Sequence, residues 1–419
     1  MVNIRHIAIS IFLFMNFRIF QYFPGMKYVQ ELWYVLCAAV LLFTYPIIKL
    51  NDSLVFTKTE IYLLIMIILI PLMSMFPAYF VFGQPLFYGL VSMRGVFLLA
   101  GVLLLLICLR HEIISFAMLE KSFVIIIWSS FCLYILMNLF LNPDSFHDYG
   151  LGFVVKGYGN EKSGFKFQDN FQILGVFYYF FKGFKEKTKM SYVYSVVLLM
   201  FLFAGHGGRG MTISLGFTLL YFLYRWGGLT RIFKFVPVVV IGVILFVSVA
   251  YLISPEQVIN RAGKFSDAFT VVLKREEVED TSANARLLTT LAAIPYIENH
   301  FIFGCGNISS QWNDGFGGVI GTYFHPSDIG FIGIIFMYGV VGLIIYLYQV
   351  VLALKASKSS RYQECNPLID AAKCILMYLF IYSIQTGFFV HNIEITMTYI
   401  VIIACYGVRD NGVGSYTAC

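Results

Sequence analysis

Charge is the feature that this sequence most lacks. Only 12% of its 419 residues are charged, whereas 59% are hydrophobic, and the mean hydropathy is +0.79. A soluble domain carries about 25% charged residues, so this chain has too few charges to cover a surface that faces water. It also lacks any hydrophilic block long enough to form a soluble domain of its own. The composition therefore predicts a single polytopic membrane domain over residues 1–419.

Signatures of several enzyme and binding classes are missing as well. The chain has no P-loop in a cytoplasmic position, no dinucleotide-binding fingerprint, no zincin motif and no Ser-centred elbow. Its cysteines lie mostly in apolar runs and only Cys305 falls in a predicted outer loop, which indicates neither a disulfide framework nor a cysteine-rich metal site. The net charge of +6 forms no patch on a soluble scaffold. We interpret it as topogenic charge beside anionic lipid and not as a nucleic-acid site.

Long apolar runs dominate what is present. A hydrocarbon core about 30 Å thick needs roughly 20 apolar residues in a helix. The sequence predicts twelve all-helical spans, near 7–23, 28–48, 61–82, 94–109, 122–141, 169–183, 192–205, 211–226, 235–253, 327–353, 368–388 and 392–408. The first of them imitates a signal peptide, but Arg18 interrupts it and no small-residue cleavage site follows. We therefore interpret it as an uncleaved span.

The distribution of lysine and arginine orients these spans. Four lysines lie between residues 182 and 190, and further basic loops follow near 225–234 and 355–361. Basic residues accumulate in cytoplasmic loops, and the three loops alternate correctly if all are cytoplasmic. The same alternation places Lys49, Lys58, Arg110 and Arg409 inside, and it predicts that both termini are cytoplasmic.

Two predicted outer loops are long, covering residues 142–168 and 254–326. The second is too long for a plain connector, and within it Leu287, Leu291 and Ile294 recur at helical spacing. We expect a helix over 283–299 that lies on the membrane surface or across the mouth of the bundle. Pro295 predicts a kink or break in that helix.

Three outer-face residues carry the chemistry that the sequence predicts. Arg209 lies in a glycine-rich turn between the seventh and eighth spans, and Arg286 lies near the start of the loop helix. A guanidinium group pairs with two phosphate oxygens and keeps its charge at any relevant pH. His325 precedes the tenth span and could act as a base or orient a hydroxyl, since the pKa of imidazole lies near neutrality. The alternatives are an arginine that reaches lipid headgroups, a solvated loop arginine and an interfacial histidine.

Other polar residues at the outer ends of spans are candidates for substrate contacts, with a structural role as the alternative for each. They are Arg94 at the fourth span, Asp169 and Asn170 before the sixth, Asp328 after His325, and His391, which forms a rival catalytic cluster with Asn392 and Glu394.

In their order along the chain, these segments resemble the O-antigen polymerase and ligase family, the Wzy/WaaL-type bacterial glycan polymerases. That family has a Gly/Ser-Arg motif that opens a span, a large periplasmic loop with an Arg helix, a Gly-x-Gly, and a His shortly before a span with a Gly-x-x-Gly pair. The corresponding residues here are Gly207-Gly208-Arg209, Arg286, Gly304-Cys305-Gly306, His325 and Gly339-Val340-Val341-Gly342. Asp169-Asn170 is similar to the family's loop-to-span motif ending Pro-Asn. The resemblance covers roughly residues 150–350, and it departs from the family where Pro326 follows His325 and where Gly208 precedes Arg209.

The resemblance implies a GT-C-like glycosyltransferase bundle in the bacterial inner membrane, with its active site facing the periplasm. It implies an oligosaccharide substrate carried on undecaprenyl diphosphate, with no nucleotide sugar, no cofactor and no essential metal. Arg209 and Arg286 would stabilise charge on the diphosphate leaving group, and His325 would assist the attack of an acceptor hydroxyl on the anomeric carbon. The lipid tail would lie between spans, and a chain-length regulator protein is a candidate partner.

Two further activities stay open from the sequence. A ligase, which moves finished chains onto lipid A–core, belongs to the same reaction class. A flippase of lipid-linked oligosaccharide would suit twelve spans, but transporters place charged residues near the midplane or in paired repeats. The charges here, apart from Arg18, lie at predicted helix ends. We therefore expect a polymerase of O-antigen or capsular polysaccharide, with the ligase and the flippase as alternatives.

Overall fold

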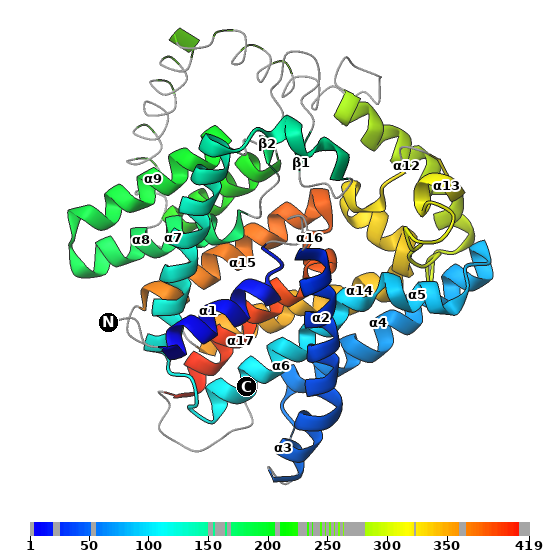
Figure 1. Cartoon of the computed structure of the whole chain (residues 1–419), viewed down its shortest axis with the longest axis horizontal. Helices are drawn as coiled ribbons and strands as arrows, with labels where there is room; N and C mark the ends of the chain where they lie inside the picture. Colours follow the sequence, from blue (N-terminus) through cyan, green and yellow to red (C-terminus); the bar gives the residue numbers. More distant parts are fainter. Residues whose placement is uncertain are drawn as a thin grey trace.

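The computed structural model describes a predominantly helical protein (Figure 1). The described residues are 4–19, 26–51, 56–149, 154–155, 164–165, 169–205, 210–224, 281–321, 324–359 and 366–409, with isolated positions between 225 and 280. The predicted span near 235–253 therefore lies outside the described residues except at single positions.

The helices follow one another with few strands between them. They are α1 (Ile4–Asn16), α2 (Met26–Ala39), α3 (Tyr45–Asn51), α4 (Lys58–Phe82), α5 (Leu86–Ser92), α6 (Leu98–Arg110), α7 (Phe116–Phe140), α8 (Asn170–Glu186), α9 (Lys189–Gly205), α12 (Thr281–Asn299), α13 (Phe316–Val319), α14 (Gly330–Ser359), α15 (Pro367–Thr386), α16 (Phe388–His391) and α17 (Ile393–Arg409). A further apolar helix spans Gly210–Tyr224, and short helical turns include η2 (Arg94–Phe97) and η4 (Pro326–Asp328). Strand β1 (Val154–Val155) pairs antiparallel with β2 (Gly164–Phe165).

Among the described residues, five helices are long and apolar enough to cross a membrane, and a sixth candidate is a helix pair bent by 51° at Met93. These candidates coincide with the predicted spans near 28–48, 61–82, 94–109, 122–141, 327–353 and 368–388. The predicted spans near 7–23, 192–205, 211–226 and 392–408 coincide with shorter apolar helices, and the one near 169–183 coincides with α8. A multi-pass helical membrane protein is thus confirmed, and the count of twelve stays a prediction.

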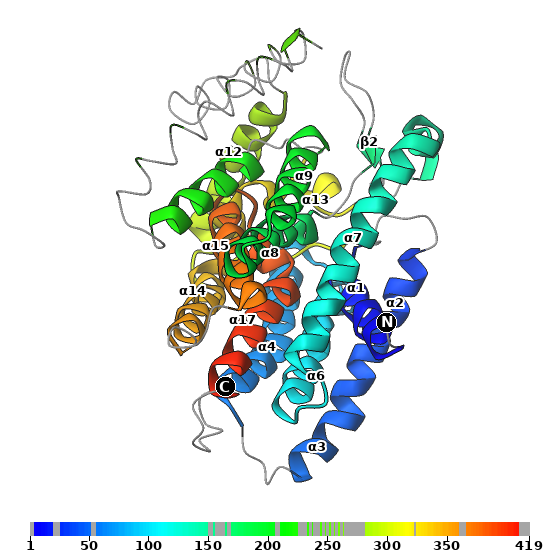
Figure 2. The ribbon, with the colours of Figure 1, turned by 90° about the vertical axis from the view of Figure 1, so that its left-hand side faces the viewer.

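The long helices α4 and α14 run antiparallel and define two ends of the bundle. The hydroxyl of Tyr62, near the start of α4, donates to the carbonyl of Ile345 in α14 at 3.0 Å. We call the end with the start of α4 and the last turns of α6 and α14 the basic end. The opposite end, where α4 ends and α6 and α14 begin, is the site end. In Figure 2, α3 lies at the bottom, on the side of the basic end, and α12 and β2 lie at the top.

At the basic end, one buried carboxylate holds two cations. Glu60 is 0% exposed, and its two carboxylate oxygens lie 2.5 Å from Nζ of Lys49 and 3.1 Å from Nη1 of Arg110. Glu60 and Thr57 also exchange hydrogen bonds as a capping box that begins α4. The alternation of basic loops in the sequence predicted that Lys49, Lys58 and Arg110 share one side of the membrane, and the structure places all three at one end.

Helix α14 is broken at Gly339, where the φ of 64° and ψ of −173° are not helical. The loop after α12 supplies partners for the backbone groups that this break frees. The N–H groups of Cys305 and Gly306 donate at 2.7 and 2.8 Å to carbonyls in the turn before the break, and the N–H of Val340 donates to the carbonyl of Phe301 at 2.9 Å. A break within a membrane span needs such partners, because lipid offers none.

Glycine is required on both sides of this contact. A methyl group on Gly339 would lie 2.1 Å from the carbonyl oxygen of Ile302, and one on Gly306 would lie 2.1 Å from that of Ser74. Both glycines also have positive φ, which other residues rarely adopt. The Gly-x-Gly and Gly-x-x-Gly pairs of the sequence are therefore two halves of one backbone clasp, which fixes the loop after α12 against α4 and α14.

The predicted loop helix is present as α12, and its bounds agree with the prediction within two residues. Of the kink or break expected at Pro295, the break is wrong, because the helix continues through this residue to Asn299, and the kink stays a prediction. Packing on both sides of the proline accounts for the continuity: Ala293 is 0% exposed, and the ring of Tyr296 contacts those of Phe82 and Phe336. Tertiary contacts here outweigh the one hydrogen bond that proline cannot donate.

Candidate functional site

Candidate residues from separate parts of the chain converge at the site end of α15. The side chain of Tyr382, one turn before the end of α15, interacts electrostatically with Asp169, Arg286 and Asp328. These three residues lie before α8, near the start of α12 and in η4. The fold therefore brings three of the residues predicted from the sequence around one side chain that the sequence did not indicate.

Arg286 lies on the exposed face of α12. Its backbone carbonyl accepts a hydrogen bond from the hydroxyl of Thr290 at 2.8 Å. None of the ion pairs between described residues includes Arg286. Its guanidinium group is thus placed to bind an external anion, with which it forms short, charge-assisted hydrogen bonds.

Asp169 and Asn170 open α8 at the edge of the site. Asp169 is the N-cap residue and is half-buried, whereas Asn170 is 3% exposed. Asp169 also interacts electrostatically with Tyr134 and Tyr378, which places its carboxylate beside the packed face between α7, α8 and α15. Of the two predicted substrate-binding residues, only Asp169 is therefore accessible from the site.

Arg209 lies outside the described residues, but the next residue in the chain is at the site. Gly210 begins its helix directly against α15: a methyl group on it would lie 2.4 Å from Oε1 of Gln385 and 3.3 Å from the ring of Tyr382. A larger residue would displace the end of the Gln385 side chain and press against the ring of Tyr382. Close packing against α15 thus explains the glycine after Arg209. The chain next to Arg209 therefore lies beside Tyr382, on which the charge of Arg286 also acts.

His325 precedes the short helix η4 and Asp328 is its last residue, and both are exposed. The chain leaves η4 through Gly330, where φ is 56° and a methyl group would lie 1.9 Å from the carbonyl oxygen of Ile384. This close crossing seats the loop with His325 on the end of α15. His325 is therefore positioned at the rim of the site and is open to a substrate.

His391, in α16, is more enclosed than His325. Its side chain is half-buried, and no hydrogen-bond partner of its Nε2 is found among the described residues. Burial, together with the charge of the nearby Arg18, lowers the pKa of His391 to about 4, and Asp328 opposes the shift. The imidazole is therefore neutral at physiological pH, which suits a group that accepts a hydrogen bond from a hydroxyl.

Acid is expected to destabilise the protein through His391. Its pKa of about 4 lies below the ordinary value of 6.5, so below pH 6.5 the unfolded chain binds a proton that the folded chain does not. Stability present at pH 7 is then lost as the pH falls towards 4, by about 2 kcal/mol at pH 5. A His391→Gln variant in detergent should lose less of its thermal unfolding temperature than the wild type between pH 7.5 and pH 5. Equal losses would contradict this role of His391.

The guanidinium group of Arg94 is bound by a carboxylate of the protein itself. Its Nε donates to both oxygens of Glu31 at 2.8 Å, and its Nη2 lies 2.8 Å from Oε1 of the same carboxylate. A further hydrogen bond from Nη1 reaches the carbonyl of Val91 at 2.7 Å. The two side chains are 34% and 38% exposed. Arg94 thus ties η2 to α2 at the site end.

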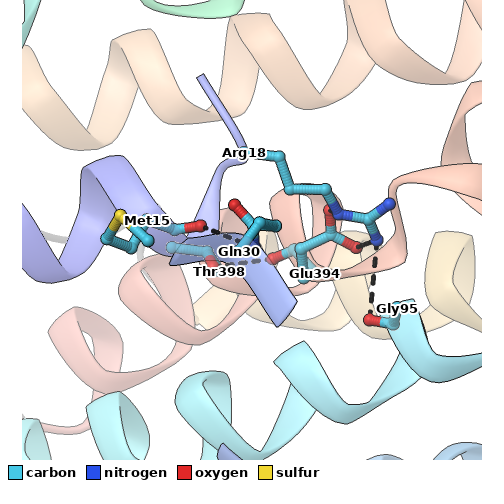
Figure 3. A network of polar contacts seen from close by, with 6 residues as sticks. All are labelled: Met15, Arg18, Gln30, Gly95, Glu394 and Thr398. Atoms are coloured by element: carbon cyan, nitrogen blue, oxygen red, sulfur yellow. Dashed lines mark hydrogen bonds and ion pairs between the residues drawn. The ribbon is translucent and has the colours of Figure 1, made fainter. Parts of the chain in front are cut away.

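A buried ion pair that the sequence did not predict joins Arg18 to Glu394, and its arginine acts electrostatically on His391. Nε and Nη2 of Arg18 lie 3.0 Å from the two carboxylate oxygens of Glu394, and Nη2 also reaches the carbonyl of Gly95 at 3.5 Å (Figure 3). Glu394 is 0% exposed, and the hydroxyl of Thr398 donates to its backbone carbonyl. Arg18 was visible in the sequence as a charge that interrupts an apolar run, and such a charge needs a partner within the bundle. Its partner Glu394, 376 residues away, could not be identified from the sequence.

Tyr382 is the other residue that the sequence did not single out. It lies within an ordinary apolar span, with no motif around it. Together, the arginine, the carboxylates and the neutral imidazole at the end of α15 can bind an anionic group and several hydroxyls at once. No group of three His, Cys, Asp or Glu side chains that could hold a metal ion occurs among the described residues.

Comparison with known proteins finds a family match for part of the chain. Residues 194–347 match the family model described as O-antigen ligase, and no curated protein and no solved structure matches the chain. The matched region contains Arg209, Arg286 and His325 together with both glycine pairs of the clasp, whereas Asp169, Tyr382 and His391 lie outside it. The resemblance seen in the sequence is thus confirmed over residues 194–347 of this multi-pass membrane protein, where the match supports an O-antigen polymerase/ligase family assignment.

Proposed function

We propose that this protein polymerises oligosaccharide repeat units carried on undecaprenyl diphosphate into O-antigen or capsular polysaccharide, at the periplasmic face of the inner membrane. The observation that carries this proposal is the packing of two segments against the end of α15, through the close contacts of Gly330 with Ile384 and of Gly210 with Tyr382. The charges of Arg286, Asp169 and Asp328 act on Tyr382 there. An anion-binding group beside two carboxylates suits a substrate that has both a diphosphate and sugar hydroxyls. The family match supports the same class of reaction.

In this reaction the acceptor hydroxyl oxygen bonds to the anomeric carbon of the donor, and the bond from that carbon to the diphosphate oxygen breaks. The electron pair of the broken bond leaves with the diphosphate, where Arg286 and Arg209 stabilise the added charge. The proton of the acceptor hydroxyl passes to a base at the rim of the site, a role that we assign to His325. Asp169, Asp328 and His391 complete the proposed set of substrate contacts. The other two candidates from the sequence, Arg94 and Asn170, are held within the protein by Glu31 and by burial.

The proposed architecture is a GT-C-like bundle of about 12 spans in one domain over residues 1–419, with residues 254–326 as a periplasmic loop. Support for the orientation comes from Lys49, Lys58 and Arg110, which gather at the end opposite to Arg286. Because basic residues favour the cytoplasmic side, the site end faces the periplasm and both termini lie in the cytoplasm. A chain-length regulator protein is the partner that we expect for such a polymerase.

The ligase reaction is the second candidate, because the matching family model is described as O-antigen ligase. A ligase would use the same leaving group but a lipid A–core acceptor. The third candidate is a flippase of lipid-linked oligosaccharide, which the buried Arg18–Glu394 pair would suit as a charge inside the bundle.

Deletion of the gene, followed by separation of the surface polysaccharide by size, tests these three activities against each other. A polymerase deletion should leave single repeat units attached to the cell surface and remove all long chains. Complete loss of attached glycan would indicate the ligase, and substrate retained on the cytoplasmic leaflet would indicate the flippase. A plasmid copy with Glu298→Gln, an exposed residue elsewhere on α12, serves as the matched control and should restore the long chains.

A further inference from the structure

The site end of α15 presents an aromatic ring in an unusual setting. Tyr382 and Tyr378 lie one helical turn apart, and their rings stack with centroids 5.7 Å apart and an angle of 13° between the ring planes. Tyr378 is 1% exposed, whereas Tyr382 is half-buried. The stack thus runs from the interior of the bundle to its surface, and the buried ring holds the outer one in a fixed orientation.

Other contacts restrict the outer ring further. The ring of Phe388 lies 6.0 Å from that of Tyr382, between centroids. On another side, Gly210 lets the backbone of the neighbouring helix approach the Tyr382 ring so closely that an added methyl group would lie 3.3 Å from it. A tyrosine that only anchors the bundle at the membrane interface needs no such arrangement. Tyr382 is therefore pre-oriented, with little conformational entropy left to lose on binding a ligand.

The charges around this ring indicate what it binds. Asp169 and Asp328 carry carboxylates, which accept hydrogen bonds from hydroxyl groups, and Arg286 carries a guanidinium group, which binds phosphate. A lipid phosphate without a sugar would leave the two carboxylates without hydrogen-bond donors from the ligand. A sugar ring joined to a phosphate fits all of these groups, since its C–H face packs on an aromatic ring and its hydroxyls point outward to the carboxylates.

We propose that Tyr382 is the floor of a sugar subsite, on which the sugar bonded to the diphosphate of the lipid carrier packs while Arg286 holds the diphosphate and Asp169 and Asp328 hold the sugar hydroxyls. The subsite rests on the proposed glycosyl transfer, because it takes the donor of that reaction. Tyr382 contributes ring contacts to the sugar and none to the phosphates.

The test compares variants of the full-length protein in lipid nanodiscs, with undecaprenyl-diphosphate-linked repeat units as the substrate. Tyr382→Ala should raise the KM for this donor by about tenfold, whereas Tyr382→Phe, which keeps the ring, should change it by less than about threefold. Tyr382→Leu keeps apolar volume without a flat face and should behave like the alanine variant. Tyr79→Ala, at an exposed tyrosine near the end of α4, is the matched control and should leave KM unchanged.

Inhibition by undecaprenyl diphosphate without a sugar separates the ring's role from that of the arginine. Its inhibition constant should be the same for the wild type and Tyr382→Ala, because the missing sugar is what the ring contacts. A wild-type KM in the alanine or leucine variant, or an equal loss of affinity for sugar-free diphosphate, would overturn the subsite while leaving the proposed function intact. A wild-type protein that neither binds nor elongates the lipid-linked donor would overturn the proposed function, and the subsite with it.

Discussion

Replacement of Arg286 by alanine is expected to lower the rate of glycosyl transfer by about 10²–10³-fold, with no loss of folded protein. The side chain is exposed and none of the described ion pairs includes it, so its removal leaves no buried group without a partner. Its proposed work lies in the transition state, where the departing diphosphate gains charge. A hydrogen-bond donor that is already in place stabilises this charge without reorganising.

The measurement is the initial rate of chain elongation by purified protein in nanodiscs, beside the amount of monodisperse protein recovered from membranes. Arg286→Lys keeps the charge but not the planar fork, and we expect it to recover only part of the rate. Glu298→Gln, on the same helix and also exposed, should match the wild type. An Arg286→Ala protein that elongates at the wild-type rate would exclude Arg286 from the reaction.

Sequence reasoning predicted the helices of this protein better than it predicted the groups that meet between them. The apolar runs that became α4, α7, α14 and α15 were found from length and composition alone, because a membrane span must satisfy its backbone within one segment. The order of short motifs also indicated Arg286 and His325. Neither signal depends on which helices are neighbours in space, and that is why both could be recognised without a structure.

The partners within the site could not be predicted in the same way. Tyr382 lies in an apolar span, where an aromatic residue gives no sign of a function. Only the packing of α15 against α8 and η4 brings it near Asp169 and Asp328. Arg94 was a candidate ligand by its position, but Glu31 in another helix binds its guanidinium group. The choice of partner for a charged group depends on which helices are neighbours, and no periodicity in one span encodes that.

The glycine motifs show a third case, in which the sequence signal was correct but its meaning was structural. Gly306 and Gly339 belong to motifs that the sequence associates with a glycan polymerase. In the structure they allow the loop after α12 to bond with the broken turn of α14. Their link to function is indirect, because the same loop connects α12, which carries Arg286, to η4, which adjoins His325.

Replacement of Glu394 by glutamine is expected to remove most of the folded protein, in contrast to the Arg286 variant. Glu394 is 0% exposed and the side chain of Arg18 only 15%. Loss of one member of a buried ion pair costs about 3–5 kcal/mol, because the remaining charge stays in the interior without its counterion. A loss of this size is comparable with the whole stability of many domains. The ion pair joins α17 to the segment after α1, so the unpaired charge of the variant would lie inside the bundle.

A matched pair and a double variant make this expectation specific. Glu31→Gln breaks the ion pair with Arg94, whose two side chains are 38% and 34% exposed, and it should cost no more than about 1 kcal/mol. The double variant Arg18→Gln with Glu394→Gln removes both charges and should recover much of the loss, because neither charge is left unpaired. Fluorescence-detected size exclusion after heating, run on detergent extracts, measures all three. If the double variant were as unstable as Glu394→Gln alone, the loss would come from packing around position 394 and not from the unpaired charge of Arg18.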